Sequence, residues 1–141
     1  MIMYIIPLLI VILSNTVYHL VSKNIASTAN TFLVLSATYG TSFISCIVLY
    51  FITKQQSLIK DLSGLKLGSF LLGIVIIGLE GGYLLMYQHG WEISKGSLVA
   101  NISVACVLFL IGFLIFKEEI NLYKILGLCS CLIGIVLMNL K

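Results

Sequence analysis

The chain has 141 residues, of which 60% are hydrophobic and 9% are charged, and its mean hydropathy is +1.16. A soluble domain usually carries about 25% charged residues, and a chain of this size buries only about 70% of its unfolded surface, so a water-soluble globular fold is excluded. The formal net charge of +3 is too small, and its Lys residues too dispersed, for a nucleic-acid-binding surface.

Five apolar runs are long enough to cross a membrane, since a transmembrane helix needs about 20 mostly apolar residues. The runs cover residues 2–21, 31–52, 67–88, 97–116 and 122–140. Short polar stretches separate them, at residues 23–30, 53–66, 89–96 and 117–121, which makes consecutive spans antiparallel neighbours. The sequence therefore predicts an all-α membrane protein, a five-helix bundle forming a single domain over residues 1–141.

The first two spans carry few polar side chains. Asn15 and His19 lie four residues apart in the first span, so a helix places them on one face. We expect this polar pair either to hydrogen-bond across helices or to line the same cavity as the acidic residue of the third span. Thr38 and Tyr39 in the second span are interpreted as packing residues.

Glu80 is the one acidic residue inside a predicted span, a little past the middle of the third run. An ionisable side chain at that depth costs at least about 2.5–3.5 kcal/mol on insertion scales, so it is expected to face a cavity or a partner. A buried carboxyl group can take up and release a proton, and Glu80 is therefore the predicted proton-binding and substrate-binding residue. The alternative is that Glu80 is a protonated tie between helices.

Aromatic side chains follow Glu80 along the chain. Tyr83, Tyr87 and Trp91 recur at offsets of three, seven and eleven residues, which a continuous helix places on the face of Glu80. An acid with a line of aromatic rings is a suitable floor for an amine or another cation. Tyr87 and Trp91 also lie near the end of the run, where aromatic belts are common, so interfacial anchoring is the alternative for both.

The remaining candidates concern packing more than chemistry. Asn101 in the fourth span is a polar residue that either lines the cavity or hydrogen-bonds between helices. Gly78 and Gly82 have the GxxxG spacing that permits close helix approach. Gly127 and Gly134 lie seven residues apart on the last span and form a candidate dimer seam.

The sequence does not indicate an enzyme. All four Cys lie within apolar runs, where a thiol stays protonated and unreactive. The two thiols of Cys129-Ser-Cys131 lie on different faces of a helix, which does not suit a metal ion. The chain contains no nucleotide-binding loop, nucleophile elbow or HExxH pattern. We therefore predict no catalytic residue, no metal and no cofactor.

The placement of Lys barely distinguishes the two orientations in the membrane. With a cytoplasmic N-terminus, the cytoplasmic side holds five Lys and the other side three, a weak positive-inside bias towards N-in and C-out. When the acidic residues are counted as well, the two sides carry the same net charge. The cytoplasmic side has five Lys and three acids and the other side three Lys and one acid, so each has a net charge of +2. The sequence leaves two interpretations open: the chain inserts in both orientations, or it inserts in one orientation with a modest bias.

The odd number of spans has a structural consequence. Many transporters consist of two inverted-topology repeats with the substrate site near the midplane, and inversion of the second repeat requires an odd number of spans in the first. A five-span chain fits one half of such an inverted-repeat transporter. The complete pathway then needs a second copy in antiparallel orientation, or a paralogue.

The last part of the chain resembles a known family. Five residues occupy positions typical of the closing helix pair of the drug/metabolite transporter superfamily: Gly112, Glu118, Asn121, Gly127 and Gly134. The best similarity is to EamA-type domains in their stand-alone five-span form, and residues 80–91 are similar to the third helix of that group. The chain departs from longer relatives at residues 102–103, where a Pro is common. Small multidrug resistance proteins are similar in the closing motif, but they have four spans and an essential acid in the first, where this chain has none.

The resemblance implies a secondary-active exporter of small metabolites or drugs in the bacterial inner membrane. Coupling to protons through Glu80 would favour cations or amines as substrates. The expected partners are the small-molecule substrate, protons, the lipid bilayer and a second subunit, either an identical chain or a paralogue, and nucleic acid is not among them. Two alternatives are a subunit of a flippase for lipid-linked sugars, because some half-size relatives move such lipids, and a non-transporting accessory protein.

Overall fold

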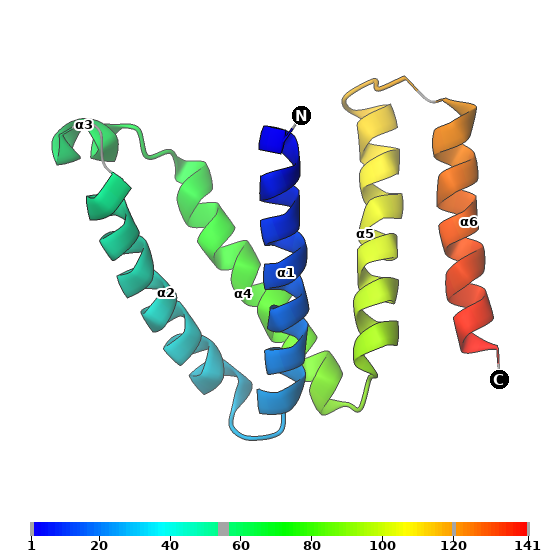
Figure 1. Cartoon of the computed structure of the whole chain (residues 1–141), viewed down its shortest axis with the longest axis horizontal. Helices are drawn as coiled ribbons and strands as arrows, with labels where there is room; N and C mark the ends of the chain where they lie inside the picture. The colour runs from blue at the N-terminus through cyan, green and yellow to red at the C-terminus, as the bar shows by residue number, and fades with distance from the viewer. Residues whose placement is uncertain (1, 54–56, 120, 141) are drawn as a thin grey trace. The chain divides into compact units, whose positions relative to one another are not determined.

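The computed structural model describes residues 2–53, 57–119 and 121–140 and consists of helices (Figure 1). The helices are α1 (Ile2–Ile25), α2 (Thr31–Thr53), α3 (Leu58–Ser63), α4 (Leu67–Gln88), α5 (Ile93–Leu114) and α6 (Leu122–Asn139). Over those described ranges the chain forms no strand. The predicted all-α fold class is therefore confirmed.

Four helices are long and apolar enough to cross a bilayer, over Ile5–Ile25, Thr31–Thr53, Leu67–Gln88 and Ile93–Leu114. The apolar part of α6, Leu122–Met138, is shorter and lies near the lower limit of about 17 residues for a span. Large apolar side chains are exposed along all five of these helices, which water would not tolerate but lipid does. The chain is an integral membrane protein.

Some helix ends differ from the approximate ends of the predicted spans. α1 continues past residue 21 to Ile25, and α5 begins at Ile93 and ends at Leu114 instead of covering 97–116. Hydropathy marks the bilayer core, whereas backbone hydrogen bonding carries a helix into its polar flanks. The polar connection 53–66 also contains the short helix α3, which the sequence analysis missed because six residues are too few to show a periodicity.

Contacts group the chain into two compact units, residues 1–89 and residues 90–141. In the first unit, α4 packs against both α1 and α2. Figure 1 shows α1 and α2 meeting at the connection between them and diverging towards their other ends. In the second unit, α5 packs against α6.

The buried side chains of the first unit gather at one end of its three long helices. They come from the end of α1, the start of α2 and the end of α4, and comprise His19, Ser22, Ala26, Thr31, Leu35, Leu84 and Tyr87. By contrast, the side chains of residues 5–17 in α1, 40–49 in α2 and 67–75 in α4 are exposed within the unit. The three helices are therefore tightly packed at the α1–α2 connection and separate away from it.

Candidate functional site

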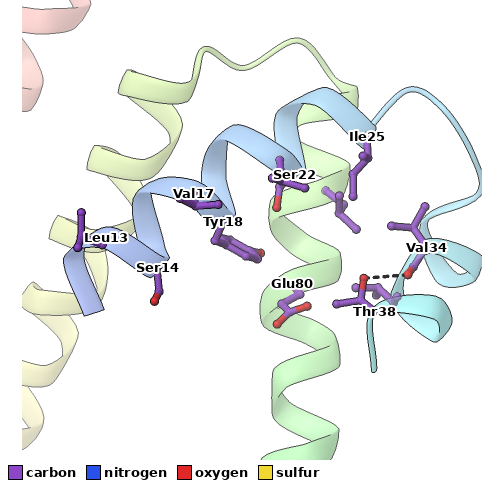
Figure 2. Close-up of a pocket in the computed structure, with 12 residues that line it drawn as sticks. Leu13, Ser14, Val17, Tyr18, Ser22, Ile25, Val34, Thr38 and Glu80 are labelled. Carbon is purple, nitrogen blue, oxygen red and sulfur yellow. Dashed lines mark hydrogen bonds between the residues drawn. The ribbon is translucent and has the colours of Figure 1, made fainter. Parts of the chain in front are cut away.

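A cavity of about 550 Å³ lies between α1, α2 and α4 (Figure 2). Its wall is mostly aliphatic, and Glu80 supplies its carboxyl group. The lining residues are Leu13, Ser14, Val17, Tyr18, Val21, Ser22, Ile25, Val34, Leu35, Thr38, Glu80 and Leu84. All of them belong to the first unit, so the cavity is a feature of that unit alone.

Hydroxyl groups from α1 and α2 supply the other polar atoms of the cavity. Ser14, Tyr18 and Ser22 follow one another at intervals of four residues, so α1 aligns them on one face. Figure 2 shows Tyr18 and Glu80 reaching into the same space from opposite helices. Thr38 donates its hydroxyl hydrogen to the carbonyl of Val34 at 3.0 Å, which leaves mainly its methyl group for the cavity wall.

Two tyrosines lie near the half-buried Glu80: Tyr18 from α1 lines the same cavity, and Tyr39 from α2 lies beside the carboxyl group. The Tyr39 hydroxyl is close to the carboxylate, yet its geometry falls short of a hydrogen bond. The Tyr18 hydroxyl is likewise buried, beside Ser22, without a well-formed bond. Two tyrosine hydroxyl groups therefore lie near the carboxylate, and neither forms a hydrogen bond with it. Tyr39 was interpreted as a packing residue, so its place beside Glu80 is new.

His19 belongs to a packed aromatic cluster. Its Nδ1 atom and the Tyr87 hydroxyl share a hydrogen bond of 2.9 Å, with the donor set by the His tautomer. The His19 ring meets Tyr83 edge-on at a centroid distance of 4.8 Å and Tyr18 at 5.1 Å. Only 5% of His19 and 3% of Tyr87 are exposed. Of the two expectations for His19, hydrogen bonding across helices is the one that the geometry supports.

Several predicted site residues are not among those that line the cavity. Tyr83 and Tyr87 stack on each other at a centroid distance of 6.3 Å, within the aromatic cluster. Asn15 is exposed on the next face of α1. α4 ends at Gln88, so the helical-face argument does not extend to Trp91, which lies in the second unit and is exposed. Asn101 is exposed on α5, also in the second unit.

A glycine outside the predicted pair, Gly81, lies at a helix contact within the first unit. A Cβ atom built on Gly81 would lie 3.5 Å from Leu35, at the contact of α4 with α2. Gly78 and Gly82 meet no described atom within 4 Å of such a Cβ position. The same holds for Gly127 and Gly134, whose role as a dimer seam stays a prediction.

A polar tie at the packed end of the unit was not predicted from the sequence. The side-chain amide of Gln88 donates to the carbonyl of Ala26 at 2.5 Å and to the hydroxyl of Thr31 at 3.0 Å. The Gln88 side chain thus joins the C-terminal end of α4 to both ends of the connection between α1 and α2. The available signal was an amide side chain at the last position of an apolar run.

The closing motif of the sequence has a structural explanation. After α5 the backbone reverses at Lys117, whose φ is 51°, and the Glu118 amide donates to the carbonyl of Gly112 at 3.0 Å. The Glu118 carboxyl group lies 3.3 Å from the point where a Cβ on Gly112 would stand, so a glycine leaves room for it. Asn121 then caps α6, accepting a hydrogen bond from the Tyr123 amide at 3.2 Å.

A comparison with protein families supports the resemblance that this motif indicated. The model of the EamA-like transporter family matches residues 1–140. No curated protein and no solved structure matches the chain. The family match spans both units and nearly every residue of the sequence. The chain therefore belongs to the EamA-like transporter family.

Proposed function

We propose that this transporter exchanges protons for small organic amines or other cations, exports them across the bacterial inner membrane, and works as a dimer. Membership of the EamA-like transporter family supports the transport of small molecules across a membrane. The observation that carries the finer proposal is the cavity with a half-buried carboxyl group, Glu80, in an otherwise aliphatic and hydroxylic wall.

The chemistry of the wall suits an exchange. A carboxylate among aliphatic side chains is costly unless a proton or a cation neutralises it. A proton and an ammonium group would both bind the same Glu80 oxygen atoms, so binding of one displaces the other. Competition at a single site couples the movement of the two species, since either occupant leaves a neutral site that can change its exposure across the bilayer.

The size and composition of the cavity favour an amphiphilic ligand. Its volume of about 550 Å³ lies within the range of roughly 300–1,000 Å³ for small-molecule sites. Val17, Val21 and Leu84 offer the hydrocarbon part of a ligand a surface without hydrogen-bonding demands. Tyr18 is the aromatic residue of the described lining, so the charge of Glu80 contributes more to binding than a row of rings does.

The test is a Glu80→Gln variant reconstituted into liposomes, with a panel of primary amines and tetraalkylammonium ions as probes. We expect uptake driven by a pH gradient to disappear, along with the release of a proton on ligand binding in detergent. Glu119→Gln removes an exposed carboxylate outside the membrane spans by the same chemical change, and transport should survive it. Coupled transport by a correctly folded Glu80→Gln variant would overturn the proposal.

The dimer part of the proposal rests on the odd number of predicted spans and on the equal net charge of the two sides. Reporter tags at both termini in native membranes test it. Comparable amounts of both orientations support an antiparallel homodimer with two Glu80 side chains near a shared midplane. A single orientation contradicts that homodimer and leaves an oppositely oriented paralogue as the partner.

A further inference from the structure

The packed end of the first unit lies directly beside the candidate cavity. Ser22, Leu35 and Leu84 belong to both, since each lines the cavity and is at least nine-tenths buried. Beyond them, towards the α1–α2 connection, Ala26 and Thr31 are exposed by 2% and 6%. On this side, therefore, close packing separates the cavity from the surface of the unit.

Hydrogen bonds between helices hold this end together. Gln88 contributes two of them, one to the carbonyl of Ala26 and one to the hydroxyl of Thr31. The bond between Tyr87 and His19 joins α4 to α1 one position earlier on α4. We call Gln88, Ala26 and Thr31 the latch. The latch joins α4 to the connection between α1 and α2, so its bonds resist separation of α1 and α2 from α4 at this end.

The opposite ends of the same helices show no comparable seal within the described part of the first unit. The side chains of residues 5–17, 40–49 and 67–75 are exposed there, and α1 and α2 diverge (Figure 1). A site that is closed at one end by a few breakable bonds and not closed at the other has the asymmetry that a transport site needs. Hydrogen bonds in membranes are weak enough to break and re-form during a transport cycle.

We propose that the packed end is the closed gate of the cavity and that the latch, assisted by the Tyr87–His19 bond, holds it shut. The proposal rests on the proposed function, because it takes the cavity as the transport site. It divides the polar residues by task. Glu80 binds the proton or the ligand, whereas Gln88 and Thr31 set how often the cavity faces the side of the α1–α2 connection.

Accessibility of single cysteines tests the gate without any substrate. The four native Cys are replaced by Ala, and the chain is held in one orientation by added Lys residues on one side. Ala29→Cys, in the exposed α1–α2 connection, then identifies the membrane face on the gate side. Ser22→Cys then reports access to the cavity from that face, and Ser14→Cys reports access from the opposite face. Labelling rates are measured with a membrane-impermeant thiol reagent applied to one face at a time.

Two substitutions remove the latch in steps. Gln88→Leu removes both of its bonds and Thr31→Val one, and the isosteric control Thr28→Val removes a hydroxyl that donates to Ile25 at 2.7 Å in the same connection. Each interhelical bond corresponds to about a threefold change in the open population. We expect labelling of the Ser22→Cys reporter from the gate side to rise about threefold for Thr31→Val and on the order of tenfold for Gln88→Leu.

Reciprocity separates a gate from simple loosening. If Gln88→Leu shifts the transporter to the state open on the gate side, labelling of the Ser14→Cys reporter from the opposite face must fall. Unchanged labelling at Ser22→Cys, an increase without that fall, or an equal increase with Thr28→Val would each overturn the gate. These rates involve no transport and no Glu80 variant, so a failure of the gate and a failure of the proposed function are distinguishable.

Discussion

The buried hydrogen bond between Tyr87 and His19 permits a quantitative test of how the first unit is held together. Tyr87→Phe deletes the hydroxyl, keeps the ring, and leaves Nδ1 of His19 unpaired at a site where Nε2 already lacks a partner. Hydrogen bonds measured by double-mutant cycles within a membrane protein average about 0.6 kcal/mol and reach about 1.7 kcal/mol. Because His19 is 5% exposed and water cannot replace the lost hydroxyl, we place this bond in the upper half of that range.

The assay is a double-mutant cycle of Tyr87→Phe and His19→Phe. The folded fraction of detergent-solubilised protein is followed while the denaturing detergent is increased. Tyr87→Phe should cost about 1–1.7 kcal/mol when His19 is present and close to nothing in the His19→Phe background, since no ring nitrogen then remains to be satisfied. Tyr123→Phe, at a 79% exposed ring on α6, should change nothing. An equal cost of Tyr87→Phe in both backgrounds would show that the hydrogen bond does not stabilise the unit.

Substitutions at three further positions test local features outside the cavity. Asn121→Ala removes the cap of α6 and should lower stability by about 0.5–2 kcal/mol in the same detergent assay, whereas Asn121→Ser should retain most of it. Lys117→Gly relieves a positive φ of 51° and should raise the midpoint, while Lys117→Val should lower it because a β-branched residue is strained there. Tyr50→Phe deletes the 2.8 Å bond to Asp61 that ties α3 to α2, so trypsin should cut α3 several-fold faster, and unchanged cleavage would show that the tie is dispensable.

Hydropathy alone was sufficient for the class of protein and for the approximate positions of its long helices. The cost of exposing the backbone in lipid makes a run of about 20 apolar residues helical almost regardless of its detailed sequence. The cost of placing an ionisable side chain in lipid likewise identified Glu80 as a candidate functional residue, since a carboxyl group at that depth is expected to face a cavity or a partner. The closing motif from Gly112 to Gly134 was sufficient for the family, which the match over residues 1–140 confirms.

Tertiary structure decided which side chains share the cavity with Glu80. The stripe of Ser14, Tyr18 and Ser22 lines the cavity, whereas the neighbouring pair of Asn15 and His19, one residue along the chain, does not. One residue turns a helix by about 100°, so the choice depends on the rotation of α1 about its axis. Hydropathy cannot predict that rotation, because lipid and protein neighbours are equally apolar and leave no amphipathic pattern to read.

The latch is a second feature that the sequence could not predict, because its residues are far apart along the chain. Gln88 is 62 residues from Ala26 and 57 from Thr31 along the chain, and nothing in the local sequence pairs them. Their contact follows from the packing of α4 against both α1 and α2. Composition and hydropathy by themselves determined a membrane protein with an acidic residue within a span, and the resemblance of the closing motif gave its family. Only the packing of three helices decided that Glu80 faces a cavity while Tyr87 and Gln88 close its end, because non-local contacts depend on how the helices cross.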